Sequence, residues 1–179
     1  MIRIALYTGL LLSAVPALAA TPAFHPGPVF KTMAPIATIA SDLPIPKGSV
    51  FKVVFDVTEG AEPGRINAAL VTAARFFNVH VEAGVPAKDI HLALVVHGPA
   101  GEDLTTAAMF GARHNGAANA SAPAIAELLG HDVQIIICGQ SAAGRDITKA
   151  DLLPGVKMSL SAASAHALLQ NAGYTLNPF

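Results

Sequence analysis

Apolar residues in this chain fall into short continuous runs separated by segments with helical spacing. Three runs rich in β-branched residues predict strands buried on both faces of a parallel sheet: 51–57, 90–96 and 133–138. Between the first two, apolar residues at 65–83 recur every three or four positions, which predicts a helix with one buried face. Weaker patterns predict helices at 102–110, at 123–129 and from Ser161 to about Ala172, and short strands at 156–160 and 174–176.

Alternating strands and helices are typical of an α/β fold. The pattern predicts an α/β sandwich with a mostly parallel sheet of about five strands. The length, 179 residues, suits a single domain with a proper core. Spacing along the chain does not determine the order of the strands.

The first twenty residues have the features of a signal peptide. Arg3 provides the positive charge, residues 4–15 the apolar segment, and Ala17–Ala19 an A-x-A cleavage site, so we expect cleavage after Ala19 or Ala20. The apolar run is too short for a membrane-spanning helix, and no lipid-attachment cysteine follows it. We therefore expect a periplasmic or secreted protein without a membrane anchor.

Residues 21–50 form a proline-rich segment. Its six prolines forbid a helix and favour extended backbone. Interspersed Phe24, Phe30 and Ile36 make the segment too apolar for a free linker. We expect an arm that wraps the domain or reaches a neighbouring subunit. The chain thus divides into a signal peptide (1–20), the arm (21–50) and an α/β domain (51–179).

Composition and motifs exclude several classes of partner. Eleven Lys and Arg residues nearly balance twelve Asp and Glu residues, and no basic run suggests binding to nucleic acid or anionic lipid. Neither a glycine-rich nucleotide fingerprint nor a G-x-S-x-G elbow is present. The seven histidines are scattered without metal-ligand spacing, so we expect no metal site and no cofactor.

Cys138 is the only cysteine, and it ends the strand predicted at 133–138. Open α/β sheets place ligands at this edge, and the turn at Gly139, Gln140 and Ser141 offers N–H groups that favour a thiolate. The alternative is an inert, buried thiol, and position alone favours neither. A lone cysteine cannot form a disulfide within its own chain, so in an exported protein it is buried, paired between chains, or kept for chemistry.

His97 ends the second predicted strand at the same edge as Cys138 and is a candidate to orient or deprotonate the thiol. The alternative, which we favour, is a structural role in which the imidazole donates a hydrogen bond to a loop carbonyl and so holds the turn. Asp56 ends the first strand, where we expect it to bond loop N–H groups. Arg145 is expected to be a solvated surface residue.

A polar loop at 111–116 is the other candidate for ligand binding. It contains Arg113, His114 and Asn115. Asn67, Asn78 and Asn119 lie in apolar surroundings, and we expect each to be a structural amide.

Five segments resemble the DsrE/DsrF-like family, in its exported bacterial branch. They are FKVVFDVTEGAE, ARFFNVHVEAGVP, LALVVHGPA, VQIIICGQSAAGRDI and DLLPGVKMSLSAASAHALLQNAGYTLNPF. The resemblance implies a three-layer α/β/α domain that assembles into trimers or hexamers. Several cytoplasmic members of that family carry sulfur as a persulfide on a cysteine after a central strand, which would be Cys138 here. Those relays are cytoplasmic, and some members lack the cysteine, so the fold does not imply the chemistry.

Three hypotheses follow, and whether the protein is an enzyme stays open. The first is a periplasmic sulfur carrier or sulfurtransferase-type relay protein using Cys138, supported by His97 and the N–H groups of Gly139–Ser141, with a sulfur donor or acceptor protein as partner. The second is a non-catalytic, oligomeric binding module that holds a small ligand or partner at His97 and the 111–116 loop. The third is a redox sensor that forms a Cys138–Cys138 bridge between subunits.

Overall fold

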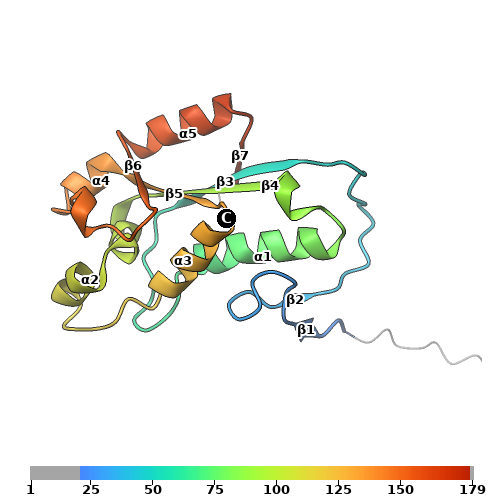
Figure 1. Ribbon diagram of the computed structural model, residues 1–179, viewed down its shortest axis with the longest axis horizontal. Coiled ribbons are helices and arrows are strands. Elements are labelled where there is room, and N and C mark those ends of the chain that lie inside the picture. Colours follow the sequence, from blue (N-terminus) through green and yellow to red (C-terminus); the bar gives the residue numbers. More distant parts are fainter. Residues whose placement is uncertain (1–20, 178–179) are drawn as a thin grey trace, which may run out of the picture.

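Five parallel strands form the central sheet of the protein, in a computed structural model that describes residues 21–177 (Figure 1). The strands are β3 (Phe51–Val57), β4 (Ile90–Val96), β5 (Gln134–Cys138), β6 (Lys157–Ser159) and β7 (Thr175–Asn177). Their order across the sheet is β6-β5-β4-β3-β7, and every pairing is parallel. The predicted parallel sheet of about five strands is confirmed. The expected signal peptide lies outside the described residues.

Helices cover both faces of the sheet, which confirms the three-layer α/β/α architecture. α1 (Ala68–Glu82) and α3 (Ala122–Gly130) lie on one face, and α5 (Ala162–Asn171) lies on the other (Figure 1). The larger core lies on the α1 and α3 side. Beneath α5 the core contains only six buried residues: Val54, Ala93, Val95, Ile136, Ala165 and Leu169.

Capping side chains determine where two of these helices begin. α1 begins at Ala68 rather than at 65 because the Asn67 side chain accepts a hydrogen bond from the Ala69 N–H. α5 begins after Ser161, whose Oγ accepts from the Ser164 N–H at 3.0 Å. The predicted cap of α5 is therefore confirmed.

The single helix predicted at 102–110 is wrong. The structure has a 3₁₀ helix, η2 (Gly98–Leu104), followed by α2 (Ala107–Arg113). Thr105 interrupts the helical path with extended backbone (φ −94°, ψ 155°). Thr106 then caps α2 by accepting from the Met109 N–H. Two further one-turn 3₁₀ helices are η1 (Ala87–Asp89) and η3 (Lys149–Asp151).

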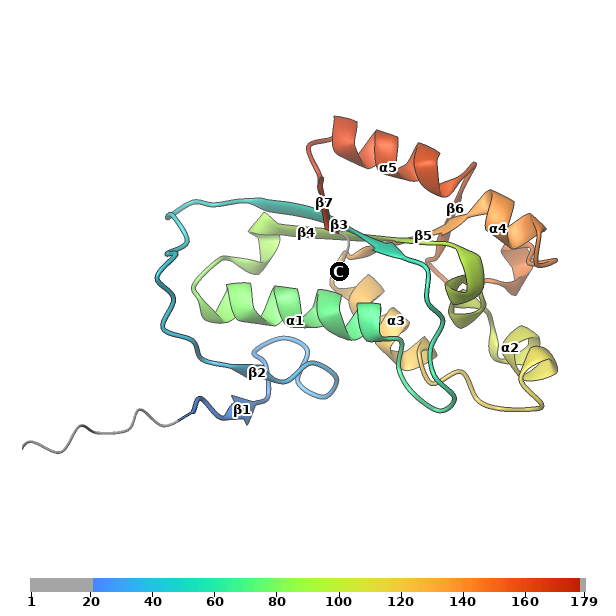
Figure 2. The same ribbon diagram turned by 180° about the vertical axis from the view of Figure 1, so that it is seen from behind.

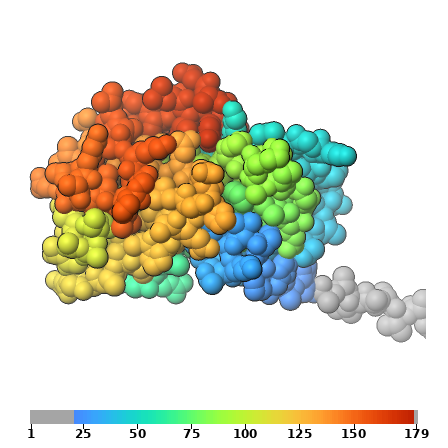
Figure 3. Space-filling model, in the orientation of Figure 1, coloured from blue at the N-terminus to red at the C-terminus, as the bar shows by residue number. Residues whose placement is uncertain are grey.

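The proline-rich arm packs against its own domain, beside α1. Its two short strands, β1 (Phe24–His25) and β2 (Ile36–Ala37), pair antiparallel below that helix (Figure 2). Asn78 of α1 accepts from the Val29 and Phe30 N–H groups and donates to the Phe30 and Ala34 carbonyls. In the space-filling view the arm, drawn in blue, packs directly against the body of the domain (Figure 3). Of the two expected roles for the arm, wrapping the domain is the one seen in the chain.

Among the described residues, none of the helices combines the length and the apolar character that a membrane span requires.

Candidate functional site

Asp56, His97 and Cys138 lie at the carboxyl edge of three neighbouring strands, on the face that α5 covers. Two positions earlier in each strand, Val54, Val95 and Ile136 all belong to the core under α5. Side chains alternate between faces of a strand, so the three polar residues point to that same face. Val96 pairs with Ile137, which places His97 beside Cys138 on the adjacent strand.

The Cys138 sulfur lies among hydrogen-bond donors. Cys138 is the N-cap of α4 (Gly139–Ala143), and its Sγ accepts from the Ser141 N–H at 3.5 Å. Burial alone would raise the pKa of the thiol. The backbone N–H and side chain of Ser141, with the N–H groups of Ala162 and Gln140, outweigh burial and hold the pKa below its ordinary value.

Ala162 is the first residue of α5, so the amino terminus of a second helix also reaches the sulfur. Gly139 makes this approach possible because it lies between Cys138 and the segment that leads into α5. A Cβ at position 139 would lie 2.5 Å from the Ser159 carbonyl oxygen and 3.2 Å from that of Leu160. The Gln140 side chain donates to the same Leu160 carbonyl at 3.3 Å.

Ser141 connects the thiol to the loop after β4. Its Oγ accepts from the Gly98 N–H at 3.1 Å. Gly98 has a positive φ of 59°, a conformation that glycine adopts without strain, and it directly follows His97. The loop that carries His97 is thereby fixed to the turn that carries Cys138.

Cys138 is only 5% exposed. A disulfide between two subunits requires Cα atoms about 4.4–6.8 Å apart, so the burial of Cys138 disfavours the bridge between subunits. Buried as it is, the thiol favours small reagents over large ones.

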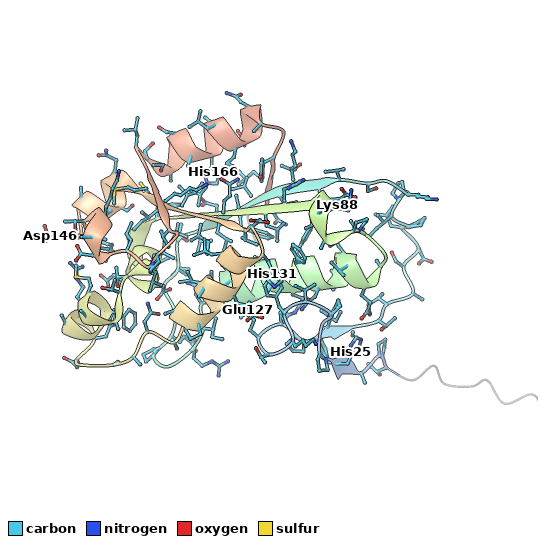
Figure 4. All side chains as sticks on the ribbon, viewed as in Figure 1. His25, Lys88, Glu127, His131, Asp146 and His166 are labelled. Carbon is cyan, nitrogen blue, oxygen red and sulfur yellow. The ribbon has the colours of Figure 1, made fainter. Side chains whose placement is uncertain are left out.

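The His97 side chain bonds to Asp56, so the loop carbonyl that was expected as its partner is wrong. Its Nε2 lies 3.0 Å and 3.2 Å from the two carboxylate oxygens of Asp56. His166, on the sheet-facing side of α5, places its own Nε2 2.6 Å from Asp56 Oδ1 (Figure 4). Among the described residues, no hydrogen bond joins His97 directly to Cys138.

Asp56 therefore accepts from two histidines, and the expectation that it bonds loop N–H groups is wrong. Burial would raise the pKa of this carboxyl, but the hydrogen bonds and charges of His166 and His97 lower it below the usual value. Nδ1 of His166 is buried without a hydrogen-bond partner within residues 21–177.

A second polar cluster surrounds Glu102. Its carboxylate lies 3.0 Å from His114 Nε2, 3.0 Å from Arg145 Nη1 and 3.4 Å from Arg113 Nη1. Arg113 also donates to the Arg145 carbonyl. Arg145 is thus an ion-paired residue that joins the turn after α4 to η2, rather than a solvated surface residue.

His114 and Asn115 line a pocket of about 290 Å³ between the loop after β3 and the loop after α2. Arg65, Phe110 and Arg113 also line it, and the His114 ring stacks on Phe110 with centroids 4.0 Å apart. Its lining includes neither Cys138 nor His97. The predicted site residues therefore divide between two places, the thiol edge and this pocket.

Buried amides fix the loops at this edge, as expected of Asn67 and Asn119. Asp103 Oδ2 accepts from the Asn67 side chain at 2.7 Å and from the Ala61 N–H at 2.8 Å. Asn119 donates to the carbonyls of Asp103 and Thr105. Burial raises the pKa of the Asp103 carboxyl, although its two donors oppose that effect.

His166 and Glu102 belong to these clusters but escaped the sequence analysis. His166 lies one turn into a helix whose start, Ser161, was predicted, but the way in which that helix lies over the sheet does not follow from local sequence. No group of three or more metal-ligating side chains forms within the described part of the chain.

Comparisons with known proteins address the fold. The model of the DsrE/DsrF-like family matches residues 51–178. A solved structure of a protein of unknown function, MTH1491 from Methanobacterium thermoautotrophicum, is similar with a TM-score of 0.53 at 17% sequence identity. The similarity covers 72% of this chain and 99% of the archaeal one. No curated protein sequence matches the chain.

Proposed function

Because the chain belongs to the DsrE/DsrF-like family, whose fold is of the sulfur-relay type, we propose that it carries sulfane sulfur on Cys138. The observation that supports this most is the set of donors around the Cys138 sulfur. Three backbone N–H groups, from α4 and from the start of α5, and the Ser141 hydroxyl stabilise negative charge there. Such a site stabilises the thiolate that attacks and the persulfide anion that results.

The proposed reaction transfers one sulfur atom without net oxidation or reduction. The Cys138 thiolate attacks the outer sulfur of a persulfide or polysulfide, and a new S–S bond forms while the donor's S–S bond breaks. The donor leaves as a thiolate and takes up one proton. Transfer to an acceptor thiol repeats the same exchange with Cys138 as the leaving group.

The burial of the Cys138 thiol limits the size of the sulfur donor that can reach it. With 5% of Cys138 exposed, a hydropersulfide or short polysulfide reaches the sulfur more easily than a folded donor protein does. We propose small sulfane-sulfur compounds as the first donors. A partner protein would then act as acceptor or donor through opening of the α4 and α5 segments.

Cyanide tests the proposal because it removes sulfane sulfur as thiocyanate. Wild-type protein treated with polysulfide and desalted is expected to release about one thiocyanate per chain, and Cys138→Ser none. Loaded protein mixed with a small thiol is expected to release sulfide. Equal thiocyanate from both proteins, or none from wild type, would contradict the carrier function.

We also propose that the protein is exported to the periplasm and assembles into a homo-oligomer. The signal-peptide pattern of residues 1–20 supports export to the periplasm. Exposed leucines on the α5 side of the sheet support a homo-oligomer: Leu160 at 82%, Leu168 at 69% and Leu176 at 42%. Family resemblance favours a trimer or a hexamer.

The 290 Å³ pocket favours a second candidate function, a module that binds a small ligand. Arg65 and Arg113 bring guanidinium groups to its lining, beside Glu62, and a guanidinium suits an anionic ligand group. In that case Cys138→Ala would retain binding, and Arg113→Ala would lose it. Calorimetry with small dicarboxylates and sulfonates on both variants separates the two functions.

A further inference from the structure

The Asp56 carboxylate lies between two histidines on the face of the sheet that carries Cys138. We propose that Asp56 and His166 are positioning residues that hold His97 as the proton acceptor and donor for sulfur transfer at Cys138. This inference rests on the proposed carrier function, and it assigns roles to two residues that the carrier function by itself does not need.

The bonding pattern fixes the tautomer of His97. An ionised carboxylate only accepts hydrogen bonds, so the Nε2 that lies 3.0 Å from Asp56 Oδ1 carries the hydrogen. In the neutral ring, Nδ1 then carries the lone pair and is the basic atom. The same logic places the hydrogen of His166 on its Nε2, 2.6 Å from Asp56.

The strand register determines what the basic nitrogen can reach. His97 continues the extended path of β4 (φ −148°, ψ 179°) and lies beside Cys138 on the neighbouring strand. Neighbouring strands are about 4.8 Å apart, and since no direct hydrogen bond joins the two side chains among the described residues, the proposed proton transfer runs through one intervening water. Asp56, His97 and Cys138 thus follow one another across β3, β4 and β5.

His166 fixes the carboxylate from the other side. It comes from α5, the helix whose first N–H also reaches the Cys138 sulfur. Within the described residues, the titratable side chains bonded to Asp56 are these two histidines, and neither Lys nor Arg pairs with it. α5 therefore supports both the thiolate and the histidine pair.

The role of His97 is to balance the proton in each transfer. The Cys138 thiol gives its proton to His97 Nδ1 before its thiolate attacks the sulfane sulfur. The S–S bond of the donor breaks, and His97 returns that proton to the departing thiolate. In discharge, His97 takes the proton of the acceptor thiol, the acceptor thiolate attacks the outer sulfur of the Cys138 persulfide, and His97 returns that proton to the departing Cys138 thiolate.

Two reagents separate the proton step from the thiolate itself. Polysulfide loading needs a proton for the leaving sulfur, whereas alkylation by iodoacetamide releases iodide and needs none. We expect Asp56→Asn and His97→Gln to slow loading about tenfold or more. His97→Gln removes the base, and in Asp56→Asn the new amide can donate to Nε2 of His97 and so reverse its tautomer. Alkylation at alkaline pH, where the thiol is already ionised, should stay at the wild-type rate.

The pH–rate profile for loading provides a readout that a purely structural role would not move. Wild type should show an ionisation that Asp56→Asn and His97→Gln lose, and Asp56→Glu should restore part of it. His166→Gln tests the outer residue by a smaller loss of the same kind. His91→Gln is the matched control, because His91 is an exposed histidine at the opposite end of the same strand.

The outcomes are distinguishable. Wild-type loading rates and pH profiles in folded Asp56→Asn and His97→Gln would overturn the positioning role and leave the carrier function intact. A parallel loss of loading and alkylation would also overturn it, because the defect would then lie in the fold of the site. Failure of wild type itself to take up sulfur would overturn both proposals.

Discussion

At the scale of single residues, Ser141 has the most direct effect on the thiol. Its N–H donates to the Cys138 sulfur at 3.5 Å, its side chain also lowers the pKa of that thiol, and its Oγ accepts from the Gly98 N–H. Sequence analysis placed Ser141 in a ligand-binding turn. The structure shows which of its atoms face the sulfur, which spacing cannot reveal.

Ser141→Ala is expected to raise the pKa of Cys138, because one donor to the thiolate is lost. In wild type the alkylation rate should increase with pH through a midpoint below the ordinary thiol value of about 8.5. In Ser141→Ala that midpoint should move upward, so reactivity at neutral pH falls. Iodoacetamide rates measured across pH test this, with Ser41→Ala in the arm as control. An unchanged midpoint would exclude the hydroxyl as a donor.

The residues of the thiol edge could be predicted from the sequence, but the hydrogen bonds between them could not. Cys138, His97 and Asp56 were placed at one edge because parallel strands end together. The pairing of His97 with Asp56 depends on which face each side chain uses, and that follows from the register of β3 against β4. The contribution of His166 depends on how α5 lies over the sheet, which local sequence does not encode.

At the scale of elements, the turn from β5 into α4 and the loop from β6 into α5 are in close contact around Gly139. This contact brings the first N–H of α5 to the sulfur. The prediction of a single helix at 102–110 was wrong because of a feature of the same kind, the junction between two elements. Thr105 and Thr106 end η2 and cap α2, and a helical pattern of apolar residues does not show such an interruption.

Gly139→Ala is expected to destabilise the protein by about 1–3 kcal/mol, because its Cβ would collide with the Ser159 carbonyl. The β6–α5 loop must move away, so the Cys138 pKa should rise as the Ala162 N–H withdraws. Chemical denaturation and alkylation rates measure the two effects.

Gly130→Ala is the matched control, since its Cβ would meet no atom within 4 Å at the end of α3. It should be neutral or slightly stabilising. Equal stability of the two variants would mean that the segments around Gly139 are not in close contact.

Asn78 joins α1 to the arm, and its loss is expected to release that contact. Asn78→Leu leaves buried N–H and carbonyl groups of Val29, Phe30 and Ala34 without partners, at a cost of about 2–4 kcal/mol. Proteolysis within residues 21–46 should then accelerate. Asn171→Ala, at an exposed position on α5, should change neither property. Unaltered protease resistance of Asn78→Leu would show that the other contacts of the arm, among them Arg75 with the Pro35 carbonyl and Thr38 with Glu82, are sufficient to hold it.

At the scale of the whole molecule, the two faces of the sheet differ in how well they are covered. α1, α3 and the arm bury a large core on one side, and α5 alone covers the other. Alternation of strands and helices predicted the layers. It did not predict that the arm thickens one layer, because the arm contacts residues far along the chain, such as His131, whose ring lies edge-on to Phe30 with centroids 5.0 Å apart.

Leu168→Asp is expected to weaken assembly, because Leu168 is a 69% exposed apolar residue on the thinner layer. A charge there should shift the oligomer toward monomer in light scattering at micromolar concentration. Leu43→Asp, also at an exposed leucine but on the arm, should leave the oligomer unchanged. An unchanged oligomer in Leu168→Asp, or a monomeric wild type, would exclude this face as the interface.

The central claim is that Cys138 in the folded protein accepts one sulfur atom, and intact mass tests it most directly. Protein beginning at Thr21 would be incubated with polysulfide, desalted and weighed beside Cys138→Ser. A gain of about 32 Da in wild type only, reversed by a reductant, is the result we predict. No gain in the folded protein, with the thiol reacting only after denaturation, would identify Cys138 as an inert core residue and contradict the account.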